Sequence, residues 1–369
     1  MKRVIGLIIL LMSTSCASAQ PATTTTPSMR LTYRGCAKLA PTARDQLQRS
    51  FAIHGLSGIA YAGGDSYWTV ADNNDKLVKI SVKLNGDGSI ASASVLNGVT
   101  IADVHDNEGI SLAKDGKSAF VSEEDTPGIH EYSLEDGRRL KSLDIPDVFL
   151  HGHTVHNRGF ESLSETADGK SLWTANEHAL TVDGSPQSVV EPFGSTTRVR
   201  LVRFALAQDG SAKAVEQFVY QTAGVHELAG FNSLTDLAAL GDRQLLALER
   251  SGGEGLTGVK SIKSRIFLVT IAGATDVSRP PFDKGLGRTP STQKTSPARA
   301  LRMVRKELLY EGFVCEKTGQ NLEGLCLGPQ LAPGRFAVLG VVDDTDGALH
   351  LSHTQVVAFE LDLSGTGKP

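Results

Sequence analysis

The sequence predicts an all-β fold, a β-propeller of five to six blades with four antiparallel strands each. Three observations lead to this prediction. A pattern of polar residue, apolar strand, turn, apolar strand and acidic or amide residue occurs five times. Two further strand-like runs follow each of the first three copies. Gly-containing turns recur throughout, whereas long helical periodicity is hard to find.

The copies of this pattern begin at Ser57, Glu108, Glu161, Asp236 and Glu323. Their starts are separated by 51, 53, 75 and 87 residues, and about 50 residues suffice for one four-stranded blade. The two wide gaps leave room for inserted loops or for a sixth blade, and residues 278–300 have the composition of such a loop. Residues 31–54 are expected to close the ring by adding a strand to the last blade.

The outer strands of the first three blades follow their hairpins directly. Each pair of apolar runs is joined by a turn that contains Gly, which is typical of antiparallel neighbours. The expected outer strands are residues 76–84 and 89–96, residues 128–134 and 138–145, and residues 200–206 and 214–220.

The hairpin turns predict which boundary residues face each other. Glu108 and Glu123 each lie seven residues from the Asp115-Gly116 turn, so a two-residue hairpin pairs them. The same reasoning applies to the other copies. The predicted pairs are Ser57 with Asp72, Glu161 with Asn176, Asp236 with Glu249, and Glu323 with Asp343.

The N-terminus has the layout of a secretory signal peptide. Lys2 and Arg3 precede an apolar run at 4–12, and Ala17-Ser18-Ala19 supplies a cleavage motif. A periplasmic or secreted protein follows from this layout. Cys16 leaves lipoprotein anchoring open as the alternative. No later segment is apolar enough to span a membrane. The predicted organisation is a signal peptide at 1–19, a flexible leader at 20–30, one propeller at 31–362 and a tail at 363–369.

The net charge of the chain narrows the classes of molecule that it can bind. The chain has 37 basic residues. Loss of Lys2 and Arg3 with the signal peptide leaves 35 basic against 41 acidic residues, a net charge of −6. This balance disfavours nucleic acid and suits cations or small polar ligands.

Export permits a disulfide. Cys315 and Cys326 are expected to pair because they close a short loop, which leaves Cys36 free or paired elsewhere.

The innermost strand of each propeller blade lines the central channel, so the boundary acids are expected to converge around the axis. Carboxylates brought together repel one another unless a cation neutralises them, and Ca²⁺ takes six to eight oxygen ligands. The alternative is structural, because acids at strand ends also accept backbone N–H groups and tie blades together. The predicted ligands are Asp72, Glu108, Glu123, Glu161, Glu177, Asp236, Glu249, Glu323 and Asp343, with Asp106, Glu124 and Asp344 alongside.

Basic residues stand beside two of the repeats. Arg158 precedes Glu161, and Arg250 follows Glu249. An arginine near a cation site suits bidentate contact with a phosphate or carboxylate, or else pairs with the neighbouring acids. His178 is a further candidate for substrate contact and proton transfer.

At these residues the sequence resembles the phytase-like family of exported bacterial proteins, described as having "esterase-like activity of phytase". The resemblance runs over about residues 50–346, and its segments are GLSGIAY, DNEGIS, NRGFESLS, FNSLTDLAAL with LALERSGG, and NLEGLCLG with VVDD. It implies a propeller-like fold and a role in phosphoester hydrolysis. The family's acids correspond to Glu108, Glu161, Asp236, Glu249, Glu323, Asp343 and Asp344. The chain departs from the pattern at Ser57, which replaces an acid, and it lacks the DDPAIW-type opening of the calcium-dependent propeller phytases.

Two functions are therefore expected, from different classes. The first is Ca²⁺-dependent hydrolysis of a phosphomonoester or phosphodiester in a phosphorylated small molecule, with Glu108, Glu161 and Glu323 as catalytic candidates. The second is a non-catalytic propeller whose acidic mouth binds a metabolite or a protein partner. The sequence leaves the oligomeric state open.

Overall fold

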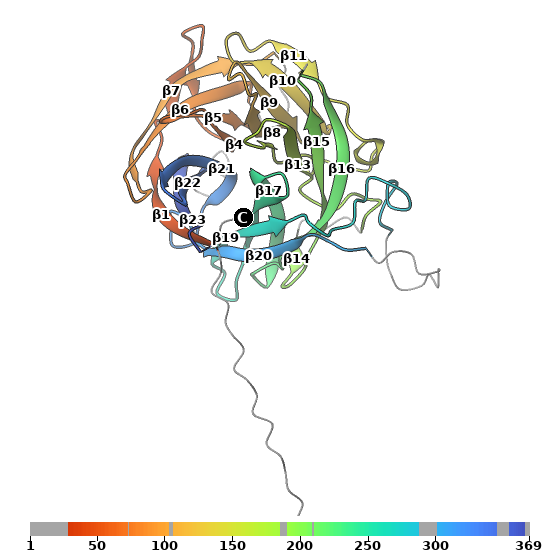
Figure 1. The fold of residues 1–369 in the computed structure, drawn as a ribbon. Helices are drawn as coiled ribbons and strands as arrows, with labels where there is room; N and C mark the ends of the chain where they lie inside the picture. The colour runs from red at the N-terminus through yellow and green to blue at the C-terminus, as the bar shows by residue number, and fades with distance from the viewer. Residues whose placement is uncertain are drawn as a thin grey trace, which may run out of the picture.

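The computed structural model describes residues 29–72, 74–102, 106–184, 190–208, 210–287, 301–344 and 354–365. Within these ranges five antiparallel sheets stand around a common centre (Figure 1). The predicted all-β propeller is confirmed, and it has five blades. The expected signal peptide and Cys16 lie outside the described residues, as do most of the leader and of the tail.

The blades follow one another along the chain, and each is listed here from its innermost strand outward. Blade I holds β4 (Leu56–Tyr61), β5 (Ser66–Ala71), β6 (Lys76–Leu84) and β7 (Ile90–Thr100). Blade II holds β8 (Asn107–Leu112), β9 (Ser118–Glu123), β10 (Gly128–Ser133) and β11 (Arg139–Ser142). Blade III holds β12 (Ser164–Glu165), β13 (Ser171–Ala175), β15 (Arg198–Leu206) and β16 (Ala212–Gln221). The expected outer strands of these three blades are confirmed.

The last two blades depart from a simple order. Blade IV holds β17 (Ala229–Gly241), β18 (Gln244–Glu254), β19 (Lys260–Thr270) and β20 (Arg305–Gly312), and the short β14 (Glu191–Pro192) pairs with β17. Blade V holds β21 (Asn321–Ala332), β22 (Arg335–Asp343), β23 (Gln355–Asp362) and the N-terminal β1 (Arg30–Lys38). Outside the blades lie a small sheet of β2 (Thr42–Arg44) and β3 (Ser50–Ala52) and the 3₁₀ helix η1 (Asp147–Phe149).

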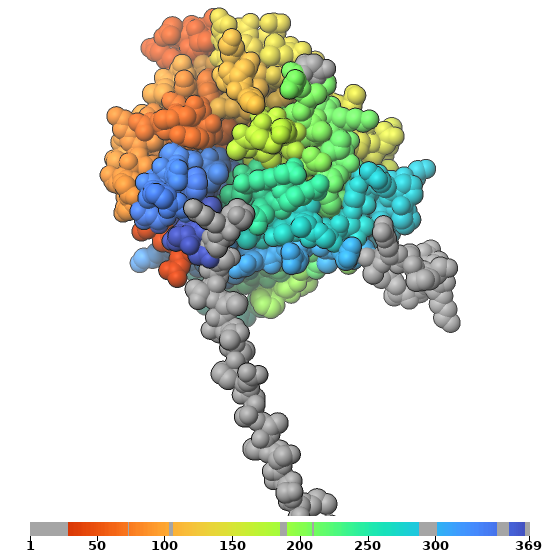
Figure 2. All heavy atoms as spheres, in the orientation of Figure 1, coloured from red at the N-terminus to blue at the C-terminus, as the bar shows by residue number. Residues whose placement is uncertain are grey.

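The N-terminal strand closes the ring. β1 pairs antiparallel with β23, from Arg30 opposite Asp362 to Lys38 opposite Gln355. The red N-terminal segment accordingly lies beside the blue C-terminal blade in Figure 2. The expected closure by the N-terminal region is confirmed, and the two ends of the propeller domain are joined by backbone hydrogen bonds.

The wide gaps between the last repeats are inserted segments. The gap before blade IV contains the segment between β13 and β15, which includes β14. The gap before blade V contains the connection from β19 to β20, in which the described residues 278–287 form turns. Among the described residues no sixth blade occurs, so insertion rather than an extra blade explains the spacing.

The hydrophobic core consists of five clusters, one between each pair of neighbouring blades. Trp68 and Val121 meet between blades I and II, whereas Trp173 packs against blade IV. Innermost strands of adjacent blades also contact one another all the way around, through β4, β8, β12, β17 and β21. Burial of these apolar faces stabilises the ring and fixes the innermost strands around the axis.

The predicted pairing of the boundary residues is wrong by one or two positions in every blade. Asn107, not Glu108, lies opposite Glu123, and Phe160 lies opposite Asn176. Asp72 donates its amide to the Gly55 carbonyl, at 2.7 Å. In the last two blades Leu234 faces Glu249 and Asn321 faces Asp343.

A recurrent β-bulge causes this difference. Near the turn of blade II the predicted register holds, with Ile110 opposite Val121. The register shifts between Ile110 and Asn107. A bulge places an extra residue on one strand and redirects side chains there. In three blades the bulge includes a glycine with no room for a side chain. A Cβ on Gly109 would lie 2.5 Å from the Leu163 amide nitrogen, and one on Gly324 would lie 2.3 Å from the Ser57 carbonyl. The bulges therefore let the innermost strands approach closely.

Candidate functional site

Six carboxyl groups from three blades form two clusters near the ends of the two inner strands of each blade. Asp72, Asp106 and Glu108 form the first cluster, and Glu124, Glu161 and Glu177 form the second. Within each cluster, one carboxylate oxygen of every member lies within 4.8 Å of those of the others. We call them the first and second acidic clusters.

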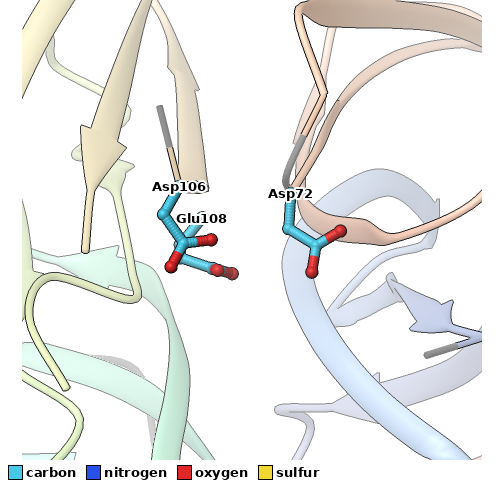
Figure 3. Close-up of side chains that lie close together, drawn as sticks. All are labelled: Asp72, Asp106 and Glu108. Atoms are coloured by element: carbon cyan, nitrogen blue, oxygen red, sulfur yellow. The ribbon is translucent and has the colours of Figure 1, made fainter. Parts of the chain in front are cut away.

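The first acidic cluster bridges blades I and II. Asp72 directly follows β5, and Asp106 and Glu108 lie at the start of β8. In Figure 3 the carboxyl groups of Asp106 and Glu108 point toward that of Asp72. The Ser57 hydroxyl donates a hydrogen bond to the Glu108 carboxylate. The serine that replaces a family acid is thus part of this site.

The second acidic cluster joins blades II and III and is completely enclosed. Glu124 follows β9, Glu161 precedes β12, and Glu177 follows β13. Their side chains are at most 5 % exposed. Glu124 shares this cluster with Glu161, and its backbone amide donates a hydrogen bond to the Asp106 carbonyl of the first cluster at 2.9 Å. The two clusters therefore form one continuous acidic centre.

Burial and mutual repulsion raise the pKa values of several of these acids. Burial, followed by the charge of Glu177, raises the pKa of Glu124 to about 9. The pKa of Glu108 and that of Glu161 are raised well above the ordinary value, first by burial and then by neighbouring carboxylates, Glu124 foremost among them. Burial also raises the pKa of Asp106. Full ionisation of this centre requires added positive charge.

Glu177 is the exception, because it has positive neighbours. Burial acts to raise its pKa, but His178, Arg158 and Arg250 together lower it. Arg158 Nη1 lies 2.8 Å from Glu177 Oε2, and Arg250 Nη2 lies 3.1 Å from Glu177 Oε1. His178 Nε2 is 3.8 Å from Glu177 Oε2, and burial lowers its pKa. The residues predicted to contact substrate therefore converge on one carboxylate.

Arg250 also connects the centre to blade V. Its guanidinium forms an ion pair with Glu323 and donates to the Asn321 amide oxygen at 3.0 Å. Asn321 Nδ2 in turn donates to Asp343 Oδ2 at 2.8 Å and to Glu323 Oε1 at 3.1 Å. Glu323 and Asp343 thus border the acidic clusters without belonging to either of them.

Three other predicted ligands also lie outside the two clusters. Glu123 contacts His130, with 3.2 Å between Oε2 and Nε2. Asp236 accepts the amides of Leu237 and Leu325, at 2.8 and 2.6 Å, and so ties blade IV to blade V. Glu249 accepts hydrogen bonds from Tyr220 and Lys306, at 2.5 and 2.7 Å. Asp236 and Glu249 therefore have the structural role that was the alternative for acids at strand ends.

Asp106 and Glu124 hold central positions that the repeat pattern did not emphasise. Glu124 is the residue after the predicted ligand Glu123, and consecutive strand residues point in opposite directions. The only available signal was the second acid in the Glu123-Glu124 pair. Asp106 similarly precedes the repeat by two positions, so its side chain points to the same face as Glu108.

The donor set fits a hard divalent cation. All six cluster side chains offer oxygen, which is what Ca²⁺ binds. Glu124 Oε1 is buried and has no hydrogen-bond partner among the described residues. An orphan buried carboxylate oxygen is costly unless something compensates it. Asn107 Oδ1, beside Glu108, is orphaned in the same way.

Similar proteins give limited further information. An uncharacterized secreted protein of Arthroderma benhamiae is 29% identical over 110 residues, which cover 22% of this chain and 21% of that protein. The match thus spans about a fifth of the relative's length. Within the described ranges, no helix has the length and apolarity needed to span a membrane.

Several known structures are similar at low levels of identity. A putative 6-phosphogluconolactonase from Bacteroides uniformis is 14% identical, with 60% of this chain and 62% of that chain covered and a TM-score of 0.32. A PQQ-bound aldose sugar dehydrogenase from Streptomyces coelicolor is 10% identical, with coverage of 89% and 98% and a TM-score of 0.36. TM-scores this low carry no argument about activity.

A family comparison covers most of the chain. The match runs from residue 52 to residue 346, which includes every member of both acidic clusters and the innermost hairpins of all five blades. The family is described as phytase-like, with esterase-like activity of phytase. The chain belongs to the phytase-like family.

Proposed function

We propose that the acidic centre binds Ca²⁺ and hydrolyses a phosphoester of a small molecule outside the cytoplasm. The observation that carries this proposal is the pair of adjacent acidic clusters, with an orphan oxygen on Glu124. Family membership supports the reaction class, and the secretory layout of the N-terminus supports a periplasmic or secreted location.

The cation ligands would come from both clusters. Asp72, Asp106 and Glu108 would hold one cation, and Glu124, Glu161 and Glu177 would hold a second. A bound divalent cation supplies positive charge that stabilises the developing charge on a phosphoryl oxygen and lowers the pKa of water. This chain's own carboxyl groups must lose protons to take up the cation, since the pKa values of Glu108, Glu124 and Glu161 are raised without it.

The remaining side chains have positioning roles. Arg158 and Arg250 present N–H donors at the edge of the second acidic cluster, where a phosphate oxygen would compete with Glu177 for them. Glu161 shares the second cluster with Glu177, the carboxylate that both arginines contact, and we assign it as the acceptor of a proton from an attacking water. Glu323, held by Arg250 and Asn321, is a second acceptor.

Phosphate release tests the proposal. Purified protein would be assayed with inositol hexakisphosphate, a nitrophenyl phosphate monoester and a bis-nitrophenyl phosphodiester, with Ca²⁺ and again after chelation. We expect turnover of at least one substrate that depends on Ca²⁺ and a loss of at least about 100-fold in Glu161→Gln. Glu311→Gln is the matched control, because Glu311 lies on the outer strand β20 and pairs with Arg265.

The opposite result would favour the non-catalytic alternative. Inactivity on all three substrates, together with no change in melting temperature on adding Ca²⁺, would refute the proposal. Inactivity together with Ca²⁺ binding would instead identify a binding propeller.

A further inference from the structure

Two cysteines far apart in the sequence meet at the seam of the ring. Cys36 lies on the closing strand β1 opposite Val357, and Cys315 follows β20 in the connection to blade V. Their thiols are neighbours, and Tyr33 lies beside both of them, with its hydroxyl 3.1 Å from the Cys315 amide nitrogen. Both cysteines are partly buried against the hydrophobic cluster between blades IV and V.

The expected pairing of Cys315 with Cys326 does not agree with this arrangement. Cys326 lies on β21 and is buried in a different cluster, the one between blades V and I. The three cysteines of the described residues are free thiols in the structure. Proximity in the sequence therefore suggested the wrong neighbour, and the ring closure brings Cys36 to Cys315 instead.

We propose that Cys36 and Cys315 form a disulfide that locks the closing strand of the propeller. The bond would enclose blades I to IV in one covalent loop. Otherwise only blade V, which contains the closing strand, bridges the seam. Without it, β1 is held by non-covalent contacts, which are its pairing with β23, side-chain packing, the ion pair of Arg34 with Glu360 and the hydrogen bond to the Tyr33 hydroxyl.

The surroundings hold the two thiols together. The Tyr33 hydroxyl accepts a hydrogen bond from the Cys315 amide at 3.1 Å, and the Tyr33 ring packs edge-on against Phe359. Cys315 has a φ of 61°, a left-handed conformation that is uncommon outside glycine and that its neighbours must stabilise. Contact with Cys315, against the effect of burial, lowers the pKa of Cys36 to about 7, so Cys36 supplies the reactive thiolate.

The chemistry balances with a disulfide donor such as glutathione disulfide. The Cys36 thiolate attacks one sulfur of the donor and displaces one glutathione thiolate. The Cys315 thiol, on losing its proton, then attacks the Cys36 sulfur of the mixed disulfide and displaces the second glutathione. The protein loses two protons and two electrons, and the donor is reduced to two glutathione thiols.

Peptide mapping tests the proposal on the intact protein. After incubation with glutathione disulfide, denaturation and alkylation, we expect a cross-linked peptide pair that contains Cys36 and Cys315, with Cys326 alkylated. Alkylation of all three thiols, or a peptide pair that contains Cys326, would overturn the proposal. This measurement needs no variant, so it does not depend on whether a mutant folds.

Variants then test the effect on the ring. Oxidised wild type should melt on the order of 5 °C above the reduced protein, and Cys326→Ser should show the same difference. Cys36→Ser and Cys315→Ser should each melt at one temperature whatever the redox state. An equal redox-dependent shift in Cys36→Ser would show that the seam does not carry the bond.

Discussion

Cation binding to the acidic centre should release protons, and its strength should rise with pH. The group that reports this most directly is Glu124, whose pKa of about 9 results first from burial and then from the charge of Glu177. A cation needs the ionised carboxylate, so below pH 9 protons compete with the cation for the two carboxylate oxygens of Glu124. Above that pH the competition ends and the affinity levels off.

The size of the effect follows from the pKa. At pH 7, two units below the pKa of Glu124, about 1 % of this carboxyl group is ionised. The apparent association constant for Ca²⁺ should therefore rise about tenfold per pH unit, or about 100-fold between pH 7 and pH 9. This corresponds to about 2.7 kcal/mol. Protons released by Glu108 or Glu161 would make the slope steeper.

Isothermal titration calorimetry measures both quantities. Ca²⁺ would be titrated at pH 7, 8 and 9 in two buffers that differ in ionisation enthalpy, which gives the number of protons released for each cation bound. Glu124→Gln should bind more weakly at pH 9 and lose at least one proton from the count. Glu165→Gln is the control, because burial raises the pKa of Glu165 to about 7 outside both clusters; it should retain the wild-type slope.

A flat profile would refute the reasoning. If the affinity does not change between pH 7 and pH 9 and the enthalpy is the same in both buffers, no proton leaves when the cation enters. The buried clusters would then not be the binding site. A pH-dependent affinity that survives Glu124→Gln unchanged would move the site to other acids.

Two further substitutions separate structural residues from the centre. Asp236→Ala should lower the free energy of unfolding by about 3 kcal/mol, because two buried amides lose their acceptor. The Ca²⁺ affinity should stay unchanged. Urea denaturation measures the stability and calorimetry the affinity, and a loss of affinity at unchanged stability would make Asp236 a ligand. Gly109→Ala should cost about 1–3 kcal/mol, because its Cβ would lie 2.5 Å from the Leu163 amide nitrogen of the next blade. Gly241→Ala, where no atom lies within 4 Å of the added Cβ, should melt close to wild type, and equal melting of both variants would contradict the close approach of the innermost strands.

The blade architecture could be predicted because its signals are local. Turn residues such as Asp115-Gly116 and the alternation of apolar residues specify each hairpin without reference to the rest of the chain. The expected outer strands were confirmed for the same reason. The blade number was left open, because inserted segments and an extra blade lengthen a sequence equally.

The acids that meet could be predicted only in part, because a one-residue shift reverses the side of a strand that a side chain occupies. The bulge near Glu108 changes the register between the turn and the end of the hairpin, so Glu123 points to His130 while Glu124 enters the centre. A bulge depends on contacts with the neighbouring blade, and the turn sequence carries no information about those contacts.

The sequence by itself determined the repeats, the polar residues at their ends and the oxygen-rich character of the site. Only the tertiary structure decided which acids share a cluster, which arginines neutralise Glu177, and that Cys36 rather than Cys326 lies beside Cys315. The physical reason is that closing the ring juxtaposes segments separated by most of the chain, and burial between blades then sets their charge and their partners.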